Sequence, residues 1–310
     1  MSFNRNSSFI SFRSKAKLNE LVEAFFKQDG SAKRLGVDSK KLARFIQEIG
    51  KKYRRNFYHN YNHAVDTVNT MGWLLERPTF KKHLNDFDRF LLLISALAHD
   101  VDHPGNDNRW EMKSKSEWAQ ECESSSVIEF HSVELTKDIL AKEECDILDG
   151  FSATERKEFI TNLEELILFT DFAEHGDFVH VFRKHIMDNG KNFSNPAFKR
   201  LVRAALLKAA DIGNLAKPFP MARRWAYRVM QENWAQGEME KAAKLPVGPL
   251  NDPDNSDFYQ AQASFIGDAA LKFFRLLYEI EEEMREFVLD MESNRDAYEN
   301  SVGQKLKSVK

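Results

Sequence analysis

The sequence predicts an all-α protein with a compact multi-helix fold, and three observations support this. Apolar residues recur at three- and four-residue spacings along most of the chain, which is the period of an amphipathic helix. Helix-breaking residues, such as Gly105, Gly150 and Pro196, fall between these stretches, where helices are expected to end. No segment alternates apolar and polar residues over a sustained length, as a half-buried strand would.

The periodicity predicts ten helices, which in chain order span Leu18–Phe26, Lys40–Ile49, Ala64–Leu75, Asp86–Ala98, Ser124–Leu140, Ala153–Leu168, Phe178–Met187, Ala197–Ala210, Ala222–Gln236 and Ser264–Met291. Before the last of them, Lys244–Asp257 contains three prolines, which prevent a regular helix. This stretch fits a surface connection and a lid or binding loop about equally well, because long loops without internal structure are uncommon and often functional.

Composition excludes several classes of protein. The chain has 310 residues, of which 30% are charged and 42% hydrophobic, as is normal for a soluble globular protein. A net charge of −3 gives no reason to expect nucleic acid or an anionic membrane as partner. The longest apolar run, Phe90–Ala98, is too short to span a bilayer. Cys122 and Cys145 form no disulfide framework and favour a cytoplasmic location.

The N-terminal stretch is basic and rich in serine. Its first nineteen residues include Arg5, Arg13, Lys15 and Lys17 but no Asp or Glu. This is only weakly similar to an organelle transit peptide. The preferred interpretation is a flexible segment over 1–17, either a frayed terminus or the edge of a longer protein.

Two histidine-containing clusters indicate a metal site. His59 and His63 lie four residues apart, so on a helix they project from one face; alone, such a pair is weak evidence. The apolar run Phe90–Ala98 leads directly into His99 and Asp100. A carboxylate at a helix C-terminus opposes the helix dipole, and a buried one requires an arginine or a metal as partner.

Two further residues extend this cluster. Pro104-Gly105 turns the chain, so that His103 can face the same place as Asp100. Asp211 repeats the arrangement at the end of the apolar run Leu201–Ala210.

Imidazoles and carboxylates in this mixture suit Zn²⁺, and a second, harder ion such as Mg²⁺ could share one bridging carboxylate and bind several waters. Two such ions are suited to cutting phosphate esters. A histidine left over from metal binding would then protonate the leaving oxygen.

The motifs around these residues resemble those of the class I cyclic-nucleotide phosphodiesterases, a helical branch of the HD-type metallohydrolases. In chain order they are Tyr58-His59-Asn60-x-x-His63, His99-Asp100-Val101-Asp102-His103-Pro104-Gly105, Glu129-x-His131, Thr170-Asp171, Asp211-Ile212-x-Asn214 and Gln262-x-x-Phe265. The match runs from about Arg54 to Ile266. It implies a catalytic domain over 18–295, preceded by the flexible segment 1–17 and followed by a flexible segment 296–310.

The resemblance implies a role for each matching residue. The first metal, Zn²⁺, would be held by His63, His99, Asp100 and Asp211. The second, Mg²⁺ or Mn²⁺, would share Asp100 and contact His103, Glu129 and Thr170 through waters. His59 would be the general acid for the 3′ oxygen. The purine site would comprise Gln262 at the base edge, Phe265 and Val229 on its two faces, and Tyr58 and Asn214 nearby.

These roles imply hydrolysis of a cyclic 3′,5′-purine nucleotide, cAMP and/or cGMP, to the 5′-monophosphate, with attack by a hydroxide that bridges the two metals. Two alternatives are an HD-type phosphohydrolase of nucleotide monoesters, which would need no purine clamp, and a catalytically silent sensor, which would have lost a ligand or His59. Departures from the family pattern affect the base pocket; they are Lys208, Gly213, Leu215, Asn233 and Ser264. The expected partners are the cyclic purine nucleotide and either a regulatory region outside this chain or a second copy in a homodimer.

Overall fold

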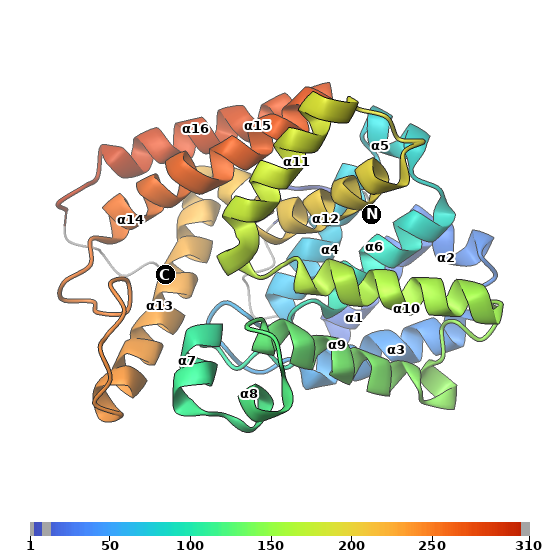
Figure 1. Ribbon diagram of the computed structural model, residues 1–310, viewed down its shortest axis with the longest axis horizontal. Coiled ribbons are helices and arrows are strands. Elements are labelled where there is room, and N and C mark those ends of the chain that lie inside the picture. The colour runs from blue at the N-terminus through green and yellow to red at the C-terminus, as the bar shows by residue number, and fades with distance from the viewer. Residues whose placement is uncertain (1–2, 8–13, 305–310) are drawn as a thin grey trace.

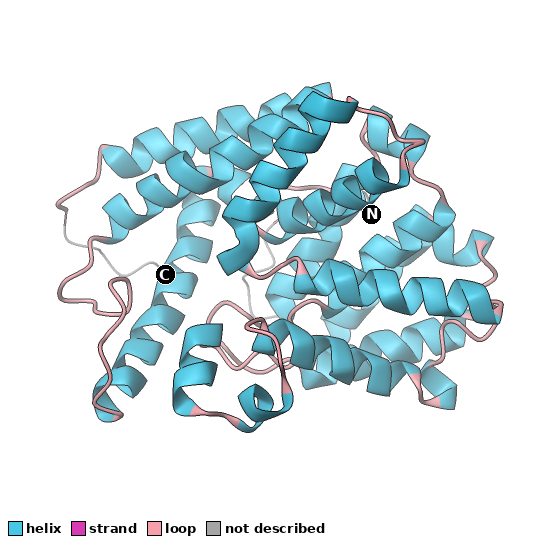
Figure 2. Cartoon of the chain, in the orientation of Figure 1, coloured by secondary structure: helices cyan, strands magenta, loops and turns pink. Residues whose placement is uncertain are grey.

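The computed structural model describes residues 3–7 and 14–304, and this part of the chain forms helices joined by loops, without a strand (Figures 1 and 2). The longer helices are α1 (Lys15–Asp29), α3 (Ser39–Lys52), α4 (Tyr61–Leu75), α6 (Asp86–Ala98), α9 (Val127–Leu140), α10 (Ala153–Leu168), α11 (His175–Asn189), α12 (Pro196–Asp211), α13 (Phe219–Ala242), α15 (Leu271–Ile280) and α16 (Arg285–Glu299). The expected all-α fold is confirmed.

Short helices and single turns connect them. These are α2 (Ser31–Arg34), α5 (Pro78–His83), α7 (Asn108–Ser114), α8 (Glu117–Glu121), α14 (Phe258–Ser264), the 3₁₀ turns η1 (Glu143–Cys145), η2 (Phe172–Glu174), η3 (Gly213–Ala216) and η5 (Glu282–Met284), and the π-helical turn η4 (Phe265–Ala270). None of the described helices combines the length and the apolar character needed to span a membrane.

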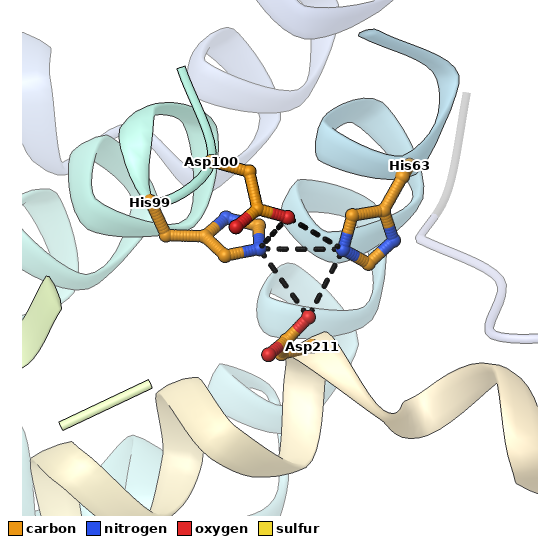
Figure 3. Close-up of side chains that lie close together, drawn as sticks. All are labelled: His63, His99, Asp100 and Asp211. Carbon is orange, nitrogen blue, oxygen red and sulfur yellow. Dashed lines mark hydrogen bonds and ion pairs between the residues drawn. The ribbon is translucent and has the colours of Figure 1, made fainter. Parts of the chain in front are cut away.

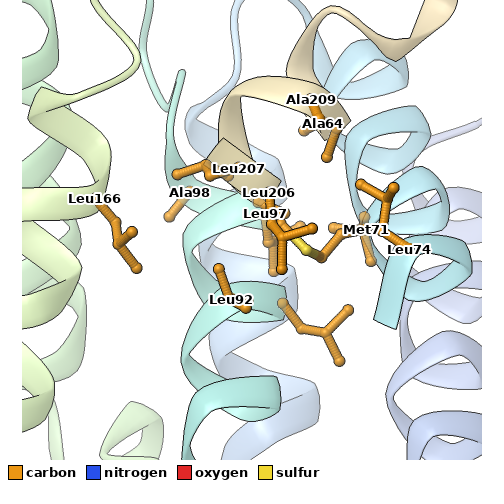
Figure 4. Packing of buried hydrophobic residues seen from close by; sticks show 14 of the residues in the cluster. Ala64, Met71, Leu74, Leu92, Leu97, Ala98, Leu166, Leu206, Leu207 and Ala209 are labelled. Carbon is orange, nitrogen blue, oxygen red and sulfur yellow. The ribbon is translucent and has the colours of Figure 1, made fainter. Parts of the chain in front are cut away.

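The centre of the fold is formed by α4, α6 and α12, which pack against one another (Figure 4). The run Phe90–Ala98 of α6 has no exposed surface on any of its faces, which explains why it is apolar except for Ser95 instead of amphipathic. Side-chain caps begin each of these helices: Asn60 for α4, the Asn85–Asp88 capping box for α6, and Asn195 for α12.

The other helices surround this centre. On one side α1 packs against both α3 and α4, and α9 lies beside α10 (Figure 1). Towards the C-terminus α16 packs against α14 and α15. Their effect on the site is to hold the C-terminal ends of α6 and α12 near the N-terminal end of α4.

The sequence predicted one continuous helix over Ser264–Met291, and this prediction was wrong. A π-helical turn occupies Phe265–Ala270, and the helix ends at Ile280 before starting again at Arg285. Glu281, at the break, is only 2% exposed, and its carboxylate accepts a hydrogen bond of 2.6 Å from the Thr79 backbone N–H. A tertiary contact therefore outweighs the local helical period.

The N-terminal segment also differs from the expectation. In its described part, 3–7, the side chains of Phe3 and Arg5 are buried, and α1 starts at Lys15, so these residues are packed and not free. Residues 1–2 and 8–13 of the segment lie outside the described residues. At the other end, α16 continues to Glu299, and 305–310 lie outside the described residues.

The proline-rich loop after α13 is anchored to that helix. The buried Glu240 carboxylate accepts hydrogen bonds from the Gly248 N–H at 2.8 Å and from Asn251 Nδ2 at 3.1 Å. The contact requires a glycine on the helix, since a Cβ at Gly237 would lie 1.9 Å from the Asn251 carbonyl oxygen. One end of the loop is thus fixed to α13, and the choice between lid and connection stays open.

Candidate metal centre and active site

Four side chains from three helix ends meet at one point (Figure 3). His63 lies in the first turn of α4, His99 and Asp100 follow the last residue of α6, and Asp211 is the last residue of α12. Each offers one donor atom, and the four atoms all lie within 4.8 Å of one another. These are the four residues that the sequence predicted as ligands of the first metal.

The spacing of the donor atoms fits a tetrahedral metal. His63 Nε2 lies 3.0 Å from Asp211 Oδ1 and 3.3 Å from Asp100 Oδ2. His99 Nε2 lies 3.1 Å from Asp100 Oδ2 and 3.3 Å from His63 Nε2. Four ligands with bonds of about 2.1 Å to a tetrahedral ion stand about 3.4 Å from one another. The two imidazole nitrogens are as close as a shared ion would bring them.

Surrounding groups orient these ligands. His99 Nδ1 lies 3.1 Å from the Ala96 carbonyl oxygen, which only accepts, so Nδ1 carries a proton and Nε2 is the nitrogen that faces the two carboxylates and could bind a metal. For Asp211, burial opposes ionisation, but His99 and His63 outweigh it and hold the pKa of the carboxyl well below its usual range. The cluster thus presents ionised carboxylates.

His59 lies beside this cluster but is not one of its four members. Its Nδ1 is 2.5 Å from Glu232 Oε2, and Glu232 Oε1 accepts hydrogen bonds from the backbone N–H groups of Tyr58 and His59 at 2.6 and 2.9 Å. Burial lowers the pKa of His59, but Glu232 outweighs it and raises the pKa to about 9. Glu232 therefore fixes the orientation of the His59 ring and favours its protonated form.

Glu232, on α13, was not predicted. It is 5% exposed, and its pKa falls to about 2 because His59 and the hydrogen bonds to it outweigh burial. It stands 173 residues from His59 along the chain. The sequence offers no local signal for this pairing, since Glu232 follows an unremarkable helical pattern.

His103 stacks on His59 with ring centroids 3.8 Å apart, but its pKa is shifted in the opposite direction, which favours the neutral ring. Burial and the positive His59 lower the pKa of His103 to about 3. Its Nδ1 accepts a hydrogen bond of 3.0 Å from the Gly105 N–H, so the neutral ring carries its proton on Nε2 and can donate to a water there.

Glu129 and Thr170 lie outside the four-donor cluster. Asn108 Nδ2 links Glu129 Oε2 at 2.9 Å to Asp171 Oδ2 at 3.2 Å. Burial and the nearby Asp171 raise the pKa of Glu129 to about 7. Thr170 donates its hydroxyl hydrogen to the Ile167 carbonyl at 2.6 Å, which leaves its oxygen as an acceptor. Within the described residues, neither Glu129 nor Thr170 shares a hydrogen bond or ion pair with the four residues of the cluster.

The residues expected around the base come from several elements. Val229 packs against Tyr58 and Trp225, and the Asn214 amide donates to the Tyr58 hydroxyl at 2.8 Å. Gln262 is buried on α14, and Phe265 begins the π-helical turn that follows. Phe265 also contacts Phe172, with ring centroids 5.1 Å apart.

Comparisons with known proteins show which family the chain resembles in sequence and in fold. The family model described as 3′5′-cyclic nucleotide phosphodiesterase matches residues 58–291. The 3′,5′-cyclic-nucleotide phosphodiesterase regA of Dictyostelium discoideum is 30% identical over 264 residues, which are 85% of this chain and 33% of that protein. The high affinity cGMP-specific 3′,5′-cyclic phosphodiesterase 9A of Drosophila melanogaster is 30% identical over 278 residues, 89% of this chain and 18% of that protein.

Solved structures show the same fold. The structure of LmjPDEB1 in complex with IBMX has a TM-score of 0.86 and 29% identity, covering 97% of this chain and 94% of that one. The phosphodiesterase domain of the Salpingoeca rosetta rhodopsin phosphodiesterase has a TM-score of 0.89 and 25% identity, covering 96% and 91%. The chain thus spans a third or less of the two curated relatives but nearly all of these solved domains.

Proposed function

Because this chain belongs to the 3′,5′-cyclic nucleotide phosphodiesterase family, we propose that it hydrolyses cAMP, cGMP or both to the nucleoside 5′-monophosphate. The observation that carries the proposal is the meeting of His63, His99, Asp100 and Asp211 beside the pair formed by His59 and Glu232. A metal-binding cluster next to a proton donor is what cleavage of a phosphate ester requires.

The donor set fits two different divalent ions. Two imidazoles and two carboxylates at tetrahedral spacing suit Zn²⁺ at the first site. Asp100 would also help to hold Mg²⁺ or Mn²⁺, which keep several waters, and His103, Glu129 and Thr170 would contact those waters. When bound, the two ions would supply Lewis acidity towards the phosphate and an activated water as nucleophile.

His59 would donate the proton that the departing 3′ oxygen needs. Its Nδ1 is engaged by Glu232, so Nε2 is the nitrogen that carries the transferable proton. Glu232 also accepts from two backbone N–H groups, which fixes the carboxylate and thereby the ring. We assign Glu232 the role of holding His59 in its protonated, oriented state.

The purine would lie between Phe265 and Val229, with its edge at Gln262. Aromatic stacking gives affinity for any purine. An amide both donates and accepts, and it can rotate to satisfy adenine or guanine. Tyr58 and Asn214, which share a hydrogen bond, would line the pocket on the side that faces His63.

Side-by-side hydrolysis assays test the proposal. The chain is incubated with cAMP, with cGMP and, as a control for general phosphatase activity, with AMP and GMP, and the products are separated by chromatography. We expect 5′-AMP or 5′-GMP from the cyclic substrates and no release of phosphate from the monoesters. Release of phosphate from AMP without cleavage of either cyclic nucleotide would contradict the proposal.

A further inference from the structure

Residues 3–7, here called the N-terminal strap, lie across α4, α16 and η3. The Phe3 ring covers Gly72 of α4, where an added Cβ would come within 2.0 Å of the ring. Asn4 and Asn69 of α4 exchange two hydrogen bonds, of 3.2 and 2.8 Å. The strap is therefore seated in a fitted position on α4, which is the helix that carries His63.

Arg5 ties the strap to the turn that follows Asp211. Its side chain is 10% exposed, and Nη1 donates a 3.0 Å hydrogen bond to the Ala216 carbonyl of η3. Nη2 pairs with Asp290 of α16 at 2.7 Å, and the guanidinium lies 4.9 Å from the centroid of the Phe287 ring. The guanidinium is thus paired with a carboxylate and also packs on an aromatic ring. A nearly buried arginine requires partners of this kind.

Lys217 ties the same turn to α4. Its ammonium is buried and donates to the carbonyl oxygens of Arg5 and Ser7, at 2.5 and 3.1 Å. It also pairs with Asp66 at 2.9 Å. Asp66 lies three residues after His63 on α4, hence about one turn away on the same face. The strap thus supplies two of the acceptors that hold Lys217 in place.

These contacts link the chain segment that follows Asp211 to the helix that carries His63. Asp211 is followed, after one residue, by η3, and η3 ends directly before Lys217. From the geometry we infer that the N-terminal strap positions Asp211 relative to His63, with Arg5 as the positioning residue. The inference rests on the proposed metal site, and it assigns a role to residues that touch neither metal nor substrate.

Zinc binding by Arg5→Ala in the full chain tests the inference. Arg275→Ala is the matched control, since Arg275 also pairs with a carboxylate of α16, at 2.8 Å, but on the exposed surface and away from η3. Zn²⁺ affinity is measured by competition with a chelator, and the visible spectrum of the Co²⁺-loaded chain reports ligand geometry. We expect Arg5→Ala to bind Zn²⁺ about 10-fold more weakly, with an altered Co²⁺ spectrum, and Arg275→Ala to match the wild type.

Arg5→Lys is a second, more conservative variant, which keeps the test valid if Arg5→Ala does not fold. A lysine keeps a charge for Asp290 but lacks the fork that reaches Ala216 at the same time, so a smaller loss of Zn²⁺ affinity with the same change of spectrum is expected. Folded variants with wild-type Zn²⁺ affinity and Co²⁺ spectrum would overturn the inference, even with a lower melting temperature. A wild-type chain that binds no Zn²⁺ would instead overturn the proposed metal site.

Discussion

The metal-binding side of the site comes from the ends of three interior helices, whereas the proposed purine side comes from α13, α14 and a π-helical turn. His63 and His99 are 1% exposed, and their donor atoms lie within 3.3 Å of those of Asp100 and Asp211. Phe265 and Val229 are only partly buried. On the proposed roles, the metal ligands would be held by the core, whereas base recognition would depend in part on Phe265 and Val229, which are less buried.

Loss of one of the four proposed ligands should abolish metal binding and, with it, hydrolysis. Asp211→Ala removes the α12 ligand, and we expect no retained Zn²⁺ by elemental analysis and a fall in turnover of about 10³-fold or more, because both ions are needed. Asp296→Ala, at an exposed carboxylate of α16, is the control and should keep full metal and activity. Full metal occupancy in Asp211→Ala would remove Asp211 from the ligand set.

Loss of the proton donor should separate chemistry from metal binding. His59→Asn is expected to keep both metals and nucleotide binding while turnover falls by about 10²- to 10⁴-fold. The exposed His180 gives a control, His180→Asn, expected to behave as wild type. Near-native turnover in His59→Asn would exclude His59 as the acid.

Loss of Glu232 should have a smaller effect with a signature in the pH profile. Since Glu232 raises the pKa of His59, and the proposed mechanism requires protonated His59, the rate should fall as pH rises through that pKa. In Glu232→Gln the fall should move to lower pH, and turnover at pH 7 should drop about 10-fold.

The control is Glu238→Gln, at an exposed position of the same helix, for which no change is expected. An unshifted alkaline limb in Glu232→Gln would show that Glu232 does not set the charge of His59.

Changes on the purine side should be smallest and should appear in KM. Gln262→Ala removes the amide at the base edge, and we expect KM to rise about 3- to 10-fold for both cAMP and cGMP with little change in kcat. Gln260→Ala, exposed on the same helix, should leave both constants unchanged. An unchanged KM in Gln262→Ala would place purine recognition elsewhere.

The same division explains what the sequence could predict. Asp100 and Asp211 were predicted because each follows an apolar run, so that a local pattern places it at a buried helix end. Glu232, Arg5 and Glu281 act on partners far along the chain, and their helical or polar surroundings show no pattern that marks the contact. Long-range polar pairs of this kind depend on the finished packing, whereas the ends of α6 and α12 are marked by neighbouring residues.

Metal removal and return test the central claim, a hydrolytic metal site at the meeting point of α4, α6 and α12. The wild-type chain is stripped by chelation, its metal content is measured, and hydrolysis of cAMP and cGMP is followed as Zn²⁺ and then Mg²⁺ or Mn²⁺ are added back. We predict no hydrolysis by the stripped chain and recovery after both ions are returned. Undiminished hydrolysis by a chain shown to be metal-free would contradict the account.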